Sequence, residues 1–167
     1  MNINPERMVN LASLCQQVGI TRESNQWLEV TQPMIDQFAE VTRDHQFIHV
    51  NPAQAATTSF GCTIAHGFLT LSLLPVFLEP LQLIPEGSQM CINYGLNRVR
   101  FPSAVKVNSR IKATTTMKAV DTSEPDRVKI TWEIVVNVAG SEKPALIAES
   151  LILWLLTPTR CTLEEIV

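Results

Sequence analysis

The chain has 167 residues, of which 46% are hydrophobic and 17% are charged, so it is long enough for one globular domain with a substantial core. Its net charge is −3 and it has no run of basic residues, which argues against a nucleic-acid partner. A polar N-terminus without a secretory signal, four scattered cysteines and the absence of a stretch of ~20 apolar residues favour a cytoplasmic, non-membrane protein of one domain over residues 1–167.

The first third of the chain predicts short helices and one short strand. Residues 5–18 have the spacing of an amphipathic helix, and residues 20–26 are polar and expected to form a loop. Residues 27–30 alternate like a strand, and Thr31 followed by Pro33 marks the start of a second helix. After residue 42 the helical pattern is lost.

The stretch from residue 60 to residue 79 is apolar and nearly uncharged, and the rest of the chain is organised around it. Its length suits a buried helix, and its leucines and other apolar residues cover most of the helical circumference. Pro75 predicts a kink or an early stop. We expect a long central helix that is wrapped on nearly every side.

The wrapping layer is predicted to be a sheet. Residues 88–100, 105–120, 127–138 and 145–156 read as strands separated by turns, and the third alternates apolar and polar side chains most clearly. Helical segments followed by a run of strands predict an α+β fold with an antiparallel sheet of about five strands.

Asp44 and His49 are the first candidates for chemistry, because a carboxylate and an imidazole can divide acid and base roles. Five residues apart, they share a site only where the segment is irregular. The alternative is a solvated helix end. His45 and His49 have a spacing that could also hold a metal, with Asp44 or His66 as third ligand.

Ala65-His66-Gly67 opens the apolar helix and is the second candidate. A helix N-terminus offers unpaired N–H groups, and Gly67 lets a ligand approach its N–H closely. The alternative is a glycine that allows the helix to pack tightly against the sheet.

A third candidate runs from Asn93 to Pro102. Gly95 within a strand suggests a bulge or a close backbone approach. Arg98 and Arg100 lie two residues apart and could meet a phosphate on one strand face. A solvated polar face is the alternative.

Together these segments resemble a known family. The chain resembles the MaoC-like hydratases, which are hot-dog-fold (R)-specific enoyl-CoA hydratases. The resemblance lies in residues 38–51 (FAEVTRDHQFIHVN), Phe60-Gly61, 64–69 (IAHGFL) and 93–102 (NYGLNRVRFP). The likeness is greatest to the nodulation protein N-like branch and spans residues 26–156. The broader family has glycine before the aspartate, where this chain has Arg43.

The resemblance implies a hot-dog fold, a homodimer and reversible hydration of trans-2-enoyl-CoA to (3R)-hydroxyacyl-CoA. It implies no metal or redox cofactor, because CoA belongs to the substrate, and it leaves open an acyl-carrier thioester. The implied catalytic residues are Asp44, His49 and Gly67, and the implied substrate-binding residues are His66, Gln46, Tyr94, Gly95, Asn97, Arg98 and Arg100. A hot-dog acyl-CoA thioesterase and a non-catalytic acyl-CoA or acyl-carrier binding protein are the rival interpretations.

Overall fold

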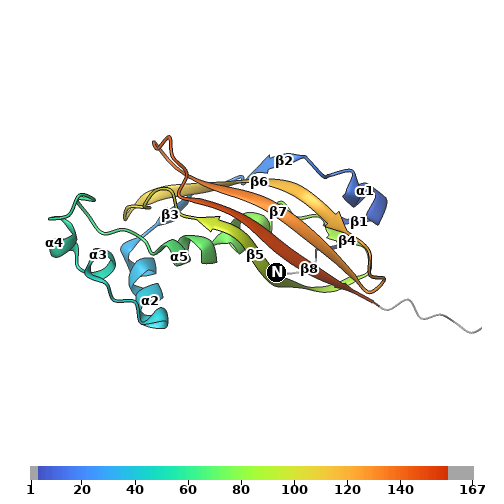
Figure 1. Ribbon diagram of the computed structural model, residues 1–167, viewed down its shortest axis with the longest axis horizontal. Coiled ribbons are helices and arrows are strands. Elements are labelled where there is room, and N and C mark those ends of the chain that lie inside the picture. Colours follow the sequence, from blue (N-terminus) through green and yellow to red (C-terminus); the bar gives the residue numbers. More distant parts are fainter. Residues whose placement is uncertain (1–3, 158–167) are drawn as a thin grey trace, which may run out of the picture.

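The computed structural model describes residues 4–157, and its main element is a twisted, six-stranded antiparallel sheet (Figure 1). The strand order β2-β6-β7-β8-β5 puts β5 at one edge, and β3 also pairs with β6. The strands are β2 (Thr21–Glu23), β3 (Leu28–Val30), β5 (Ser88–Arg100), β6 (Ser109–Asp121), β7 (Arg127–Val138) and β8 (Leu146–Leu156).

The sheet edge opposite β5 is formed by β2 and β3, which act as one interrupted strand. β2 and β3 both run antiparallel to β6, and Ser24 links them through a 2.8 Å bond from its N–H to the Ala113 carbonyl. The Ser24 hydroxyl also accepts a bond from the Ala113 N–H. The polar segment 20–26, predicted as a loop, therefore contains strand β2. Its polarity reflects an exposed sheet edge.

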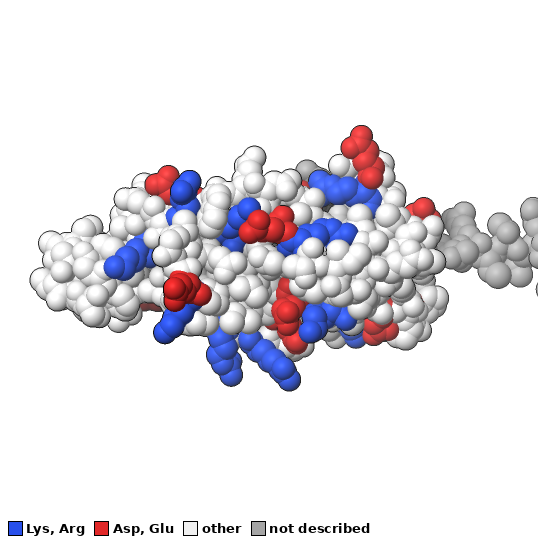
Figure 2. Space-filling view, turned by 90° about the horizontal axis from the view of Figure 1, so that it is seen from above, with Lys and Arg blue, Asp and Glu red and all other residues white. Residues whose placement is uncertain are grey.

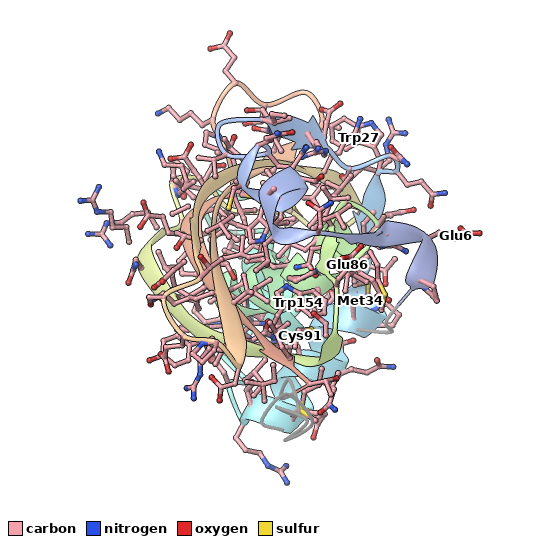
Figure 3. The ribbon with its side chains drawn as sticks, turned by 90° about the vertical axis from the view of Figure 1, so that its right-hand side faces the viewer. Glu6, Trp27, Met34, Glu86, Cys91 and Trp154 are labelled. Atoms are coloured by element: carbon pink, nitrogen blue, oxygen red, sulfur yellow. The ribbon has the colours of Figure 1, made fainter. Side chains whose placement is uncertain are left out.

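The inner face of the sheet is apolar because side chains alternate along each strand. On β7 the buried set is the predicted one: Val128, Ile130, Trp132, Ile134 and Val136. β6 and β8 contribute further buried side chains, and Trp154 of β8 lies in the interior in Figure 3, whereas Trp27 lies at the periphery. This face forms one side of the core.

The central apolar stretch forms two short helices, not one long one. α5 (Gly67–Ser72) is capped by Leu73, and α6 (Leu74–Leu78) follows at once with Pro75 in its first turn, where proline is tolerated. Ile64 and Ala65, just before Gly67, are extended, because Ile64 bridges Lys106 and the Ala65 N–H donates to the Val105 carbonyl.

The predicted wrapping of this stretch is also incomplete. Leu69, Leu74, Phe77 and Leu78 are buried, but Phe68 and Val76 are exposed, so one side of the helix pair is uncovered. The hot-dog arrangement of helix and sheet is nevertheless confirmed, since α5 lies against the curved sheet (Figure 1).

The predicted helix over residues 5–18 is also broken. It divides into a 3-10 turn (Pro5–Arg7), strand β1 (Met8–Val9) and α1 (Leu11–Cys15). β1 pairs in parallel with β4 (Ile84–Pro85), so a tertiary partner outweighs local helical periodicity.

Three helices occupy the opposite end of the molecule, beyond α5 (Figure 1). They are α2 (Gln32–Thr42), α3 (Phe47–Val50) and α4 (Pro52–Ala55). The second predicted helix is therefore confirmed as α2, with Thr31 at its N-cap position.

Charged side chains of both signs are interleaved on the face seen in Figure 2. The sheet carries cross-strand ion pairs, including Lys112 with Glu23, Lys118 with Glu133 and Lys129 with Asp121. None of the helices in residues 4–157 has the length and apolarity needed to cross a bilayer.

Candidate active site

The segment between α2 and α3 carries Asp44, and its shape depends on Arg43. Arg43 ends α2 with φ 64°, a left-handed conformation that favours glycine. Its side chain is exposed and lies 3.7 Å from the Glu40 carboxylate. The chain thus turns sharply after α2, and the Arg43 side chain points to solvent.

His49 is held from two directions on the short helix α3. Its Nδ1 lies 2.7 Å from the Ile64 carbonyl oxygen, so Nδ1 carries the proton and donates. The amide of Gln32 donates to the His49 carbonyl at 2.8 Å. This tautomer leaves Nε2 as the basic nitrogen.

Burial keeps this imidazole neutral. Loss of solvent lowers the pKa of His49 below its ordinary value of 6.5, and nearby His66 lowers it further. The hydrogen bond to Ile64 and the charge of Asp44 act in the opposite direction but are smaller than the effect of burial. At neutral pH His49 is therefore a free base.

Asp44, His49 and His66 form a compact cluster. One side-chain oxygen or nitrogen from each lies within 4.8 Å of the other two. Asp44 keeps 56% of its side chain exposed, whereas the two imidazoles are buried. The irregular segment required for Asp44 and His49 to share a site is thus present.

The geometry of the two rings disfavours a metal in this cluster. The imidazoles of His49 and His66 stack with centroids 3.7 Å apart and planes 26° apart. An imidazole nitrogen binds a metal in its ring plane at about 2.0–2.1 Å, so stacked rings cannot converge on one ion. His45 is half-exposed beside Glu40, and the predicted helical pairing with His49 is not formed because α3 begins at Phe47.

Gly67 is the first residue of α5, so its N–H has no acceptor within the helix. The Phe101 ring packs directly against it: a Cβ added at Gly67 would lie 3.0 Å from Cγ of Phe101. Close packing is therefore one reason for glycine here. The packing interpretation and the N–H interpretation both stand.

His49 and Gly67 line the same cavity, which has a volume of about 350 Å³. Its other walls are mainly apolar and include Phe60, Thr70 and the segment 101–105. A second cavity of about 410 Å³ lies between the helix pair and β5, lined by side chains such as Leu74, Leu78 and Leu96. The molecule thus offers apolar space beside the imidazole.

The remaining predicted site residues lie outside this cavity in the described chain. Gly95 lines the second cavity, while Tyr94 lies in a shallow depression with Asp121 and Lys129 on the sheet surface. Asn97, Arg98 and Arg100 are exposed at the irregular end of β5, and Gln46 is exposed at the start of α3. The bulge predicted at Gly95 is present, because the β5–β8 register shifts between Asn93 and Gly95. A second register shift lies between Asn97 and Arg100, where Arg98 has φ 52°.

Several contributors could not be found from residue types alone. The Ile64 carbonyl, the Gln32 amide and the Phe101 ring each contact a predicted site residue. A backbone carbonyl has no sequence signal, and Gln32 is an unremarkable first-turn residue.

Comparison with known proteins shows the family to which the chain belongs. The family model described as "MaoC like domain" matches residues 14–138. The chain belongs to the MaoC-like dehydratase family. It is 43% identical over 143 residues to 3-hydroxyacyl-thioester dehydratase Z of Mycobacterium tuberculosis (strain ATCC 25618 / H37Rv), covering 86% of this chain and 94% of that protein.

Two further relatives support the assignment. Nodulation protein N of Rhizobium leguminosarum bv. viciae is 42% identical over 142 residues, with 84% and 88% coverage. The solved "(R)-hydratase from A. caviae involved in PHA biosynthesis" superposes with a TM-score of 0.66 at 26% identity, covering 81% of this chain and 94% of that one. Membership confirms the predicted enzyme class, a hydro-lyase.

Proposed function

We propose that this MaoC-like protein catalyses the reversible hydration of a trans-2-enoyl thioester to the (3R)-3-hydroxyacyl thioester. The proposal rests on the cluster in which Asp44 and His49 place a carboxylate oxygen and an imidazole nitrogen within 4.8 Å of each other. The space between two such groups suits one water molecule. The names of two relatives support the proposal: a 3-hydroxyacyl-thioester dehydratase supports the reaction class, and an (R)-hydratase supports the proposed hand.

The proton transfers follow from the state of each group. The His49 Nε2 atom takes one proton from the water while the Asp44 carboxylate accepts a hydrogen bond from the other. The hydroxide oxygen bonds to C3, and the electron pair of the double bond moves toward the thioester oxygen. The imidazolium then returns its proton to C2, so that one water is added across the bond.

The Gly67 N–H is the proposed donor to the thioester oxygen. It has no helical acceptor and lines the same cavity as His49. A donor aimed at the oxygen on which charge develops stabilises the enolate-like transition state. The proton chemistry needs no metal or redox cofactor, because the imidazole and carboxylate supply it.

Coenzyme A is the proposed carrier of the acyl group. Arg98 and Arg100 are exposed at the end of β5, immediately before Phe101, which lines the catalytic cavity. Guanidinium groups at that position suit the phosphates of CoA. The exposed Gln46 amide, one turn before His49, is proposed to contact the same substrate.

We also propose a cytoplasmic homodimer that pairs through β5. Among the described strands β5 is hydrogen-bonded only to β8, and its apolar side chains Met90, Ile92, Tyr94 and Leu96 are 43–62% exposed. A long, apolar, unpaired edge of this kind is normally covered. A two-fold axis would pair β5 with its copy and put Tyr94, Gly95 and Asn97 at the subunit boundary.

The direct test uses crotonyl-CoA and a longer trans-2-enoyl-CoA with the wild-type protein. Loss of the conjugated double bond with formation of the (3R)-hydroxyacyl-CoA supports the proposal. Release of free CoA thiol without hydration would identify a thioesterase instead. Tight binding of both esters without turnover would indicate a binding protein.

A further inference from the structure

His66 is the buried polar residue nearest to the proposed catalytic pair. It is 3% exposed and directly precedes Gly67 at the start of α5. The family resemblance implied substrate binding for it. Among residues 4–157, however, the cavity lined by His49 and Gly67 is not lined by the His66 side chain.

Three contacts fix the His66 ring. Its Nε2 atom lies 2.9 Å from the Asp44 carbonyl oxygen, so Nε2 carries the proton and donates. One face stacks on His49 with centroids 3.7 Å apart. The Phe38 ring is tilted against it at 5.1 Å. These contacts tie together α2, the Asp44 segment, α3 and α5.

The burial of the other His66 ring nitrogen, Nδ1, does not contribute to the stability of the fold. His66 Nδ1 is buried and has no hydrogen-bond partner among the described residues. An unsatisfied buried nitrogen destabilises a fold, and such groups in native proteins call for a functional reason. An apolar ring of similar size would fill this space without that penalty.

We infer that His66 is a positioning residue that sets the spacing between Asp44, His49 and the Gly67 N–H. Asp44 needs it because its own carboxylate is mostly exposed and its contacts are weak, with one oxygen 3.4 Å from the Gln46 N–H and the other 4.0 Å from His66 Nε2. His49 needs it because the stacked ring limits rotation of the imidazole about its bond to Ile64. The inference rests on the proposed hydration reaction.

Two variants separate the contacts. His66→Phe keeps an aromatic ring against His49 but removes the donor to the Asp44 carbonyl. His66→Gln keeps an amide donor at a similar reach but removes the stack. His45→Phe and His45→Gln are matched controls, because His45 is half-exposed beside Glu40.

We expect each His66 variant to lose about 10²-fold in kcat, since a misplacement of about 1 Å has that effect, while KM stays within a few-fold. The thermal midpoint of His66→Phe should change little, because removal of the unsatisfied nitrogen offsets the loss of the hydrogen bond to the Asp44 carbonyl. Normal turnover in both variants, or a loss that follows a fall in midpoint, would overturn the inference. A raised KM with normal kcat would instead make His66 a substrate-binding residue.

A second readout does not depend on activity. The chain has three histidines, so ring ¹⁵N NMR of the wild type and the His66 and His45 variants can assign each one. The inference requires the Nε2–H tautomer for His66 and the Nδ1–H tautomer for His49. His49 should keep that tautomer in the His45 variants and show altered ring shifts in both His66 variants. Unaltered His49 shifts in the His66 variants would refute the positioning role, even if the wild type proved to have no hydratase activity.

Discussion

Gly67 gives the sharpest separation between a packing role and a catalytic role. In Gly67→Ala the new methyl carbon would lie 3.0 Å from Cγ and 3.1 Å from Cδ1 and Cδ2 of the Phe101 ring. Carbon atoms pack at about 3.5–4.0 Å, so the ring must shift by roughly 0.5–1 Å. Phe101 is 41% exposed and has room to move outward.

The stability cost can be bounded from that contact. Overpacking costs about 1–3 kcal/mol, and the exposed ring favours the lower end. Replacing glycine by alanine in a helix recovers up to about 1 kcal/mol. The net loss should be about 0–2 kcal/mol, which lowers the thermal midpoint of a chain of this size by at most about 8 °C.

Adding Phe101→Leu removes the clash and completes the test. If Gly67 serves only packing, the double variant should recover both the thermal midpoint and the hydration rate of the Phe101→Leu single variant. If the thioester oxygen must reach the Gly67 N–H, the double variant should regain stability but stay about 10²-fold slower, near the effect of losing an oxyanion donor. Recovery of the rate together with the midpoint would refute the oxyanion role.

Three further results are expected. The value of kcat/KM should hold as the pH falls through 6.5 and decline only below it, because burial lowers the pKa of His49 and the neutral base is active; a midpoint above 6.5 would contradict this. Joint replacement of Arg98 and Arg100 by glutamine should raise KM roughly tenfold for an enoyl-CoA but not for its N-acetylcysteamine thioester, and equal effects would exclude phosphate contacts. Light scattering at micromolar concentration should give a dimer for the wild type and Val18→Lys but a monomer for Ile92→Lys. Val18→Lys is a matched control, because Val18 is 45% exposed and Ile92 is 43% exposed. A dimeric Ile92→Lys would argue against pairing through β5.

The sheet could be predicted because strand periodicity is a local property. The alternation of apolar and polar side chains on β7 predicts one apolar face, and that face is buried in the structure. The long central helix could not be predicted correctly, because its first part is held as extended chain by Val105 and Lys106. These partners lie some forty residues away and leave no signal in the stretch itself.

The site was only partly visible in the sequence, for a similar reason. Asp44 and His49 come together because Arg43 adopts a left-handed backbone conformation. An arginine in the sequence does not predict that conformation. The stacking of His66 on His49 and the packing of Phe101 on Gly67 arise from tertiary contacts. The residue types indicated acid–base chemistry, and the family resemblance indicated that Asp44 and His49 act together. The contacts that support these two residues could be identified only from the folded structure.

The central claim is that Asp44 and His49 carry out the proton transfers, and the rate of crotonyl-CoA hydration in Asp44→Asn and His49→Ala tests it most directly. Each variant should fall by roughly 10²–10⁴-fold in kcat, the usual size of an acid–base contribution. Asp44 is largely exposed, so the thermal midpoint of Asp44→Asn should match that of the wild type. Near wild-type hydration by both variants, with (3R)-hydroxybutyryl-CoA as product, would contradict the account.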